Sequence, residues 1–152
     1  MNKFIYIAMF LIFVSCQNEN EKTIAEKYNI EKIELKSFNI RGNWKIKLDK
    51  SLNATFENKK HLGNKSTMQK KIAQENYDEI VYLLNYIDFP NLKDSIYSSF
   101  SCGSICRLKI TYDSGKIKEL YDYGREENEN LAHIYKKIEA LNNTDIYTLS
   151  RK

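Results

Sequence analysis

The sequence has 152 residues, 24 Lys and Arg against 20 Asp and Glu, and a formal net charge of +4. A balance this close to neutral, spread over both signs of charge, argues against nucleic acid as a partner. The length suits one domain with a sizeable core, and no residue pattern identifies a biochemical activity.

Residues 1–15 have the pattern of an export signal. Lys3 supplies a positive charge, and the eleven-residue apolar run from Phe4 to Val14 is too short to span a bilayer. The run ends at Phe13-Val14-Ser15-Cys16, which resembles the lipobox of bacterial lipoproteins. This resemblance implies cleavage before Cys16 and acylation of that cysteine. The alternatives are an ordinary signal peptide cut elsewhere and an uncleaved anchor.

A lipid on Cys16 makes the membrane the first expected partner of the chain. Gln17 directly after it resembles the outer-membrane sorting pattern of enteric bacteria. We therefore expect attachment to the outer membrane of a bacterial cell envelope, on its periplasmic or its surface face. Residues 16–27 lack apolar periodicity and predict a flexible tether. Residues 28–152 then form a single domain.

The first part of this domain predicts strands. Residues 33–35 have charged neighbours on both sides and indicate an opening strand. Apolar and polar residues alternate from Trp44 to Leu48 and again from Leu52 to Phe56, with a polar break at residues 49–51. Alternation on both sides of a short break predicts a hairpin with one buried face. A short strand is expected to follow near residues 67–72.

A helix is predicted over residues 76–88. Its apolar stripe consists of Tyr77, Ile80, Val81, Leu84 and Ile87. Asn76 is the expected capping residue, and Pro90 limits the helix because the residue before a proline resists helical geometry. Residues 92–101 are expected to form a connector.

A second hairpin is predicted up to Gly124. The inward side chains of its first strand are Leu108, Ile110 and Tyr112, and those of its second strand are Ile117, Tyr121 and Tyr123. Leu120 is out of phase with them, for which a bulge or a strand covered on both faces would account. A final helix with a stop at Asn142-Asn143 is expected from the stripe of Leu131, Ile134, Ile138 and Leu141.

A hairpin followed by a helix therefore occurs twice. Each helix can bury its single stripe against one face of an antiparallel sheet. The sequence predicts an α+β fold in which two hairpins form an antiparallel sheet and two helices pack on one face. The two hairpin-helix units are only loosely alike, because their internal spacings differ.

Several phrases of the domain, between about residues 33 and 149, are similar to those of a known family. They are Ile87-Asp88-Phe89, Leu92-Lys93-Asp94 with Tyr97, Leu108 to Gly115, and Tyr121-Asp122-Tyr123-Gly124. The chain resembles the small bacterial lipoprotein domains grouped as domain of unknown function 6438, common in Bacteroidetes. That family has a cysteine pair before its first hairpin, whereas this chain has one before its second. The resemblance implies no activity.

Cys102 and Cys106 are the candidate reactive residues of the domain. The first hypothesis is a disulfide in an oxidising envelope. Bonded cysteines need Cα atoms within about 7 Å, while four steps of extended strand span about 13 Å, so Gly103 to Ile105 would have to turn. The alternative is a redox or copper site that uses both thiolates, with His61 or His133 as a third ligand. We expect no metal site and no cofactor.

Catalytic motifs are absent from the sequence. It has no glycine-rich phosphate loop, no nucleophile elbow and no histidine pair at metal spacing. The acidic cluster of Glu126, Glu127 and Glu129 is explained by solvation of a polar loop. We therefore expect a protein that is not an enzyme.

The expected function is a membrane-anchored lipoprotein that serves as a binding or structural module of the envelope. Tyr112, Tyr121 and Tyr123 are a candidate binding face, because tyrosine suits interfaces. The partner would be an unknown protein or surface component. The alternatives are a redox or copper-handling lipoprotein that uses Cys102 and Cys106, and an inhibitor or immunity protein.

Overall fold

The computed structural model describes residues 27–39, 42–60, 65–98, 105–125 and 128–143. The strands within these residues are β1 (Ile30–Asn39), β2 (Gly42–Asp49), β3 (Asn53–Lys60), β4 (Lys65–Lys71), β5 (Ser95–Tyr97), β6 (Ile105–Tyr112) and β7 (Ile117–Tyr123). The α-helices are α2 (Gln74–Tyr86) and α3 (Glu129–Ala140), and the short 3-10 helices are η1 (Phe89–Asn91) and η2 (Leu141–Asn143).

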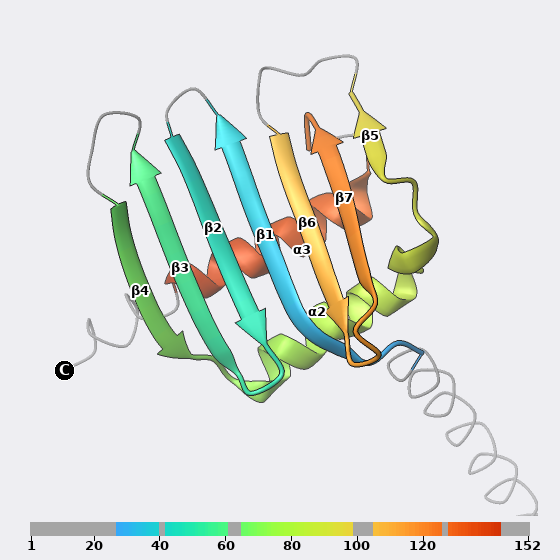
Figure 1. Cartoon of the computed structure of the whole chain (residues 1–152), viewed down its shortest axis with the longest axis horizontal. Coiled ribbons are helices and arrows are strands. Elements are labelled where there is room, and N and C mark those ends of the chain that lie inside the picture. Colours follow the sequence, from blue (N-terminus) through green and yellow to red (C-terminus); the bar gives the residue numbers. More distant parts are fainter. Residues whose placement is uncertain (1–26, 40–41, 61–64, 99–104, 126–127, 144–152) are drawn as a thin grey trace, which may run out of the picture.

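All of these strands join one sheet in the order β4-β3-β2-β1-β6-β7-β5 (Figure 1). Every neighbouring pair is antiparallel except β5 and β7, which are parallel. The predicted α+β class is confirmed in its coarse form, a mostly antiparallel sheet with two helices. The description as two hairpin units is incomplete, because the opening strand β1 lies between them and pairs with both β2 and β6.

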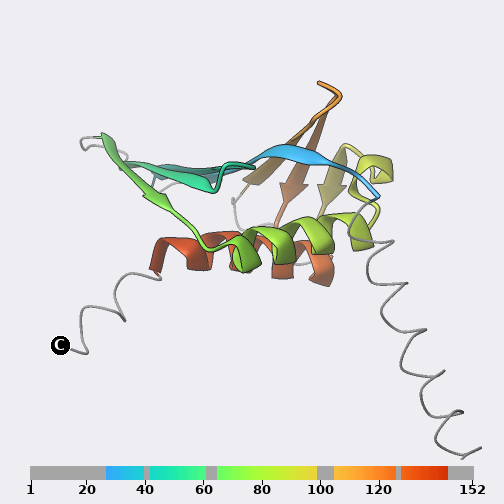
Figure 2. The same ribbon diagram turned by 90° about the horizontal axis from the view of Figure 1, so that it is seen from below.

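Both helices lie on the same side of the sheet, which we call the inner face (Figure 2). Each helix buries one stripe, from Tyr77 to Leu84 in α2 and from Leu131 to Ile138 in α3. The inward side chains of the central strands meet these stripes and are fully buried; they include Ile33, Leu35, Leu108 and Ile110. The opposite, outer face has no described helix over it.

The predicted orientation of β7 is wrong. Leu120 and Asp122 are buried on the inner face, and Tyr121 and Tyr123 lie on the outer face. The pairing of β6 with β7 is continuous, so no bulge is needed. Ile117, which suggested the wrong phase, is 52% exposed at the start of the strand.

The ends of the helices also differ from the prediction. α2 begins at Gln74, before the expected cap Asn76, and its N-cap Ala73 has no side chain that can bond to the helix. In α3, by contrast, Asn128 Oδ1 accepts a hydrogen bond from the backbone N–H of Leu131 at 3.1 Å. This cap fixes the start of α3. The predicted connector after α2 contains β5, which was not predicted.

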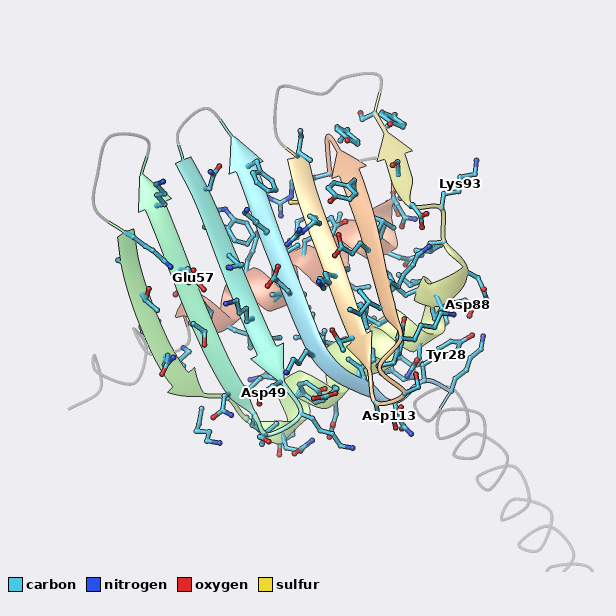
Figure 3. All side chains as sticks on the ribbon, viewed as in Figure 1. Tyr28, Asp49, Glu57, Asp88, Lys93 and Asp113 are labelled. Atoms are coloured by element: carbon cyan, nitrogen blue, oxygen red, sulfur yellow. The ribbon has the colours of Figure 1, made fainter. Side chains whose placement is uncertain are left out.

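Asp88 ties the start of the domain to the end of α2 (Figure 3). Its backbone is left-handed, with a φ of 54°. Its carboxylate accepts hydrogen bonds from Lys27 Nζ at 2.8 Å, Tyr28 Oη at 2.8 Å and Asn91 Nδ2 at 2.9 Å. The bonds from Asn91, Lys27 and Tyr28 lower the pKa of Asp88 from 3.8 to about 2.

We expect Asp88→Asn to weaken the loss of stability on acidification. Because the folded pKa of Asp88 is lowered, its contribution is fully present above its unfolded pKa of 3.8 and is lost as the pH falls through about 2. Asparagine tolerates the left-handed backbone and does not titrate. Urea unfolding of both chains between pH 5 and pH 2 measures the effect. Parallel losses of stability in the two chains would contradict this role.

Candidate functional site

A groove of about 600 Å³ opens on the inner face, beside the C-terminal end of α3. Strands β2, β3 and β4 form its apolar floor with Trp44, Ile46, Phe56 and Met68. These side chains share one face because Ile46 pairs with Phe56, and Phe56 with Met68, in adjacent strands. The α3 side of the groove includes Glu139 and Asn142.

The groove is open because the helices do not extend over β4. Nearly every side chain of β4 is exposed, and Met68 on the groove floor is 42% exposed. In Figure 2 the start of β4 stands clear of α3. The apolar floor therefore continues from the partly buried Trp44 to the edge of the sheet.

A row of buried polar side chains crosses the inner face near this groove. Ser37, Cys106 and Asp122 are register neighbours on β1, β6 and β7, and each is at most 1% exposed. Tyr135 of α3 is also fully buried, and burial, with the Asp122 carboxylate, raises the pKa of its hydroxyl. Ser37 Oγ, Asp122 Oδ2 and Tyr135 Oη have no hydrogen-bond partner within the described part of the chain. Such groups are commonly satisfied by a buried water molecule.

Arg125 connects this polar row to the groove. It follows Gly124. Both residues have positive φ values, 120° for Gly124 and 69° for Arg125. The Arg125 backbone N–H donates to Asp122 Oδ1 at 3.1 Å, and its guanidinium pairs with Glu139. The guanidinium also lies over two rings, 6.0 Å from Trp44 and 5.5 Å from Tyr135. It therefore holds β2, β7 and α3 together at the rim of the groove.

We expect Arg125→Met to lower the free energy of unfolding by about 1–3 kcal/mol, because it removes two cation–π contacts and one charged hydrogen bond. Methionine keeps most of the apolar part of the side chain, so the loss of unfolding free energy measures the contribution of the guanidinium charge. Thermal unfolding measured by circular dichroism gives the change. A matched control is Lys93→Met, which removes an exposed charge and should have little effect.

Cys106 does not have the environment of a reactive thiol. It is fully buried on the inner face of β6 and has no disulfide partner among the described residues, and burial raises the pKa of its thiol to about 11. The thiolate, which is the nucleophile and the metal ligand, is therefore disfavoured at neutral pH. Cys102 lies outside the described residues, so the disulfide remains a prediction.

The remaining predicted site residues divide into two groups. Cys16, His61, Glu126 and Glu127 lie outside the described residues. His133 and Glu129 are exposed on α3. Among the described residues, no group of three or more His, Cys, Asp and Glu could hold a metal ion. None of the described helices is long and apolar enough to cross a membrane.

The predicted tyrosine face does not form as one surface. Tyr112 is buried on the inner face, whereas Tyr121 and Tyr123 are on the outer face. Tyr97 of β5 joins them instead: its ring stacks on Tyr123 with centroids 4.7 Å apart, and it is 68% exposed. The sequence suggested Tyr97 as a possible core contact of the connector rather than as part of this face, because the three residues of β5 are too few to show strand periodicity.

The comparisons with known proteins identify one family. The model of the domain of unknown function DUF6438 matches residues 43–142, from β2 to η2. The chain belongs to the DUF6438 family. Two of the DUF6438-like phrases have structural roles, since one contains Asp88 and the other Asp122, each of which accepts hydrogen bonds. A search of curated proteins finds no match to the chain.

Proposed function

We propose that this DUF6438 protein is a non-catalytic binding module of the bacterial cell envelope, anchored to the outer membrane by a lipid on Cys16. The observation that supports a binding role is the inner-face groove, with its volume of about 600 Å³. Ligand sites are concave, about 300–1,000 Å³ in volume, and mostly apolar with a few polar groups. The groove has a volume in this range and an apolar floor of four side chains, but its rim is more polar than that of a typical ligand site and includes the Arg125–Glu139 pair.

Rigid walls favour the groove as a binding surface. Ile46 and Phe56 are fixed by strand pairing and by burial, and Trp44 is held under the Arg125 guanidinium. A preformed site loses little side-chain entropy when a partner binds. The groove therefore suits a partner that inserts an apolar group and places a polar group at the rim.

The alternative functions have less support. A redox or copper role needs a thiolate from Cys106, and its burial opposes that form. An inhibitor or immunity protein would use a groove of this kind against one protein target. Identification of the bound partner by photo-crosslinking therefore also distinguishes an inhibitor or immunity role from a general binding role in the envelope.

Photo-crosslinking in the native cells tests the binding role. A photoreactive phenylalanine analogue replaces Met68 in the groove, and in a matched chain it replaces His133, which is exposed on α3. We expect position 68 to give a discrete adduct that position 133 does not give. Mass spectrometry of the adduct then identifies the partner.

Two outcomes would contradict the proposal. Identical adduct patterns at positions 68 and 133 would mean that the groove has no selective partner. A lack of any adduct at position 68 in cells that display the protein would have the same meaning. A single toxin-like or enzyme partner would instead favour the inhibitor or immunity role.

A further inference from the structure

Within the described residues, β4 is an edge strand of the sheet. It has a described neighbour, β3, on one side only, and it contains seven residues, whereas β5 at the opposite edge contains three. On an edge strand, every second residue directs its backbone N–H and C=O away from the sheet. These groups are able to pair with a further strand.

The groove reaches this edge. Its lining includes Ser66, Thr67 and Met68, which are consecutive residues of β4. A strand added beside β4 would direct alternate side chains to the inner face, next to Met68. Apolar side chains at those positions would enter the groove. Backbone pairing and a side-chain pocket are therefore adjacent, which is the arrangement used in recognition by strand addition.

The charge of this region favours an acidic partner. Strands β3 and β4 together contain five lysines and one acidic residue, Glu57, for a net charge of +4 (5 minus 1). A second copy is disfavoured, because antiparallel pairing of two β4 strands would place Lys65 opposite Lys71. Lysines also protect sheet edges from aggregation. Protection of the β4 edge from aggregation would explain the lysines, but it would not explain why an apolar groove ends at the same edge.

We infer that β4 and the groove bind an extended acidic polypeptide segment by strand addition. The segment pairs its backbone with β4, inserts alternate apolar side chains against Trp44, Phe56 and Met68, and places its carboxylates near the lysines. The inference rests on the proposed binding function and adds the chemical class of the partner.

A fluorescence titration tests the inference. Trp44 is the only tryptophan of the sequence and lies in the groove, so its emission reports on occupancy. The full chain in detergent is titrated with a synthetic peptide of about eight residues that alternates valine or phenylalanine with glutamate. We expect saturable binding. A peptide with lysine in place of glutamate should bind about tenfold more weakly or worse.

Backbone pairing has its own test. Two further acidic peptides have N-methyl groups on alternate backbone nitrogens. One peptide is methylated at the odd-numbered residues and the other at the even-numbered residues. In a paired strand only every second N–H faces the partner. One of these two peptides should therefore bind as well as the parent, and the other should lose most of its affinity.

Matched variants of the protein test the position of the site. Met68 and Ile117 are both exposed side chains on strands, 42% and 52% respectively, but only Met68 lies in the groove. We expect Met68→Glu to weaken binding of the acidic peptide about tenfold. Ile117→Glu should leave it unchanged. Folding is intact if both variants have the melting temperature of the unchanged chain.

Three results would overturn the inference. They are equal binding of both N-methylated peptides, equal binding of the lysine peptide, and a concentration-dependent dimer that Met68→Glu abolishes. The last result would identify a second copy as the occupant. A discrete in-cell adduct at position 68 together with any of them would leave the proposed binding function in place and reject only the partner class.

Discussion

Replacing Leu108 by alanine is expected to lower the free energy of unfolding by about 2–5 kcal/mol. Leu108 is fully buried in β6 and pairs with Leu35 of β1 and Leu120 of β7, which are also fully buried. Alanine would leave a cavity at the centre of the sheet. The neighbouring strands are fixed by backbone pairing and cannot close it. Urea unfolding followed by Trp44 fluorescence measures the change.

Ile117→Ala is the control for this prediction. Ile117 is on β7 like Leu120, but it is 52% exposed, so its truncation should cost no more than about 0.5 kcal/mol. The difference between the two variants then reports burial rather than residue type. Similar losses in both would contradict the inner and outer faces assigned to the sheet.

Local alternation was enough to predict most of the strand faces. The alternating residues from Trp44 to Leu48 and from Leu108 to Tyr112 are inward in the structure, as predicted. Cys106 is in phase with Leu108. The alternation of Cys106 with the inward residue Leu108 therefore predicts a buried thiol rather than a reactive one.

β7 shows where such reasoning fails. Hydropathy favours Ile117 as an inward residue and Asp122 as an outward one, and the structure has the reverse. The buried carboxylate of Asp122 is partly satisfied, because its Oδ1 accepts the backbone N–H of Arg125 at 3.1 Å. That bond depends on the positive φ of Gly124 and Arg125, which residue periodicity does not encode.

Long-range pairing accounts for the rest of the difference between prediction and structure. β1 is central because it pairs with β6, which follows much later in the chain; Glu34 and its partner Lys109, for example, are 75 residues apart (109 minus 34). The groove exists because α3 does not cover β4. Met68, a single apolar residue in the otherwise polar strand β4, was the one local signal of it.

Replacing Cys16 by serine is expected to abolish membrane attachment. Acylation requires the cysteine sulfur, and each methylene of an acyl chain buried in a bilayer contributes about 0.8 kcal/mol. Cell fractionation and the intact mass of the membrane-extracted protein measure the anchor. Cys102→Ser is the control, since it should leave the acyl mass and the attachment unchanged.

The same mass measurement separates the anchor from the cysteine pair of the domain. A disulfide between Cys102 and Cys106 would lower the mass by two hydrogen atoms, whereas acylation of Cys16 raises it by whole acyl groups. A Cys16→Ser chain that stays in the membrane fraction with its added mass would contradict the lipid anchor. It would not affect the groove, because Trp44, Phe56 and Met68 belong to the folded domain. Membrane attachment through Cys16 and partner binding in the groove are therefore tested independently of each other.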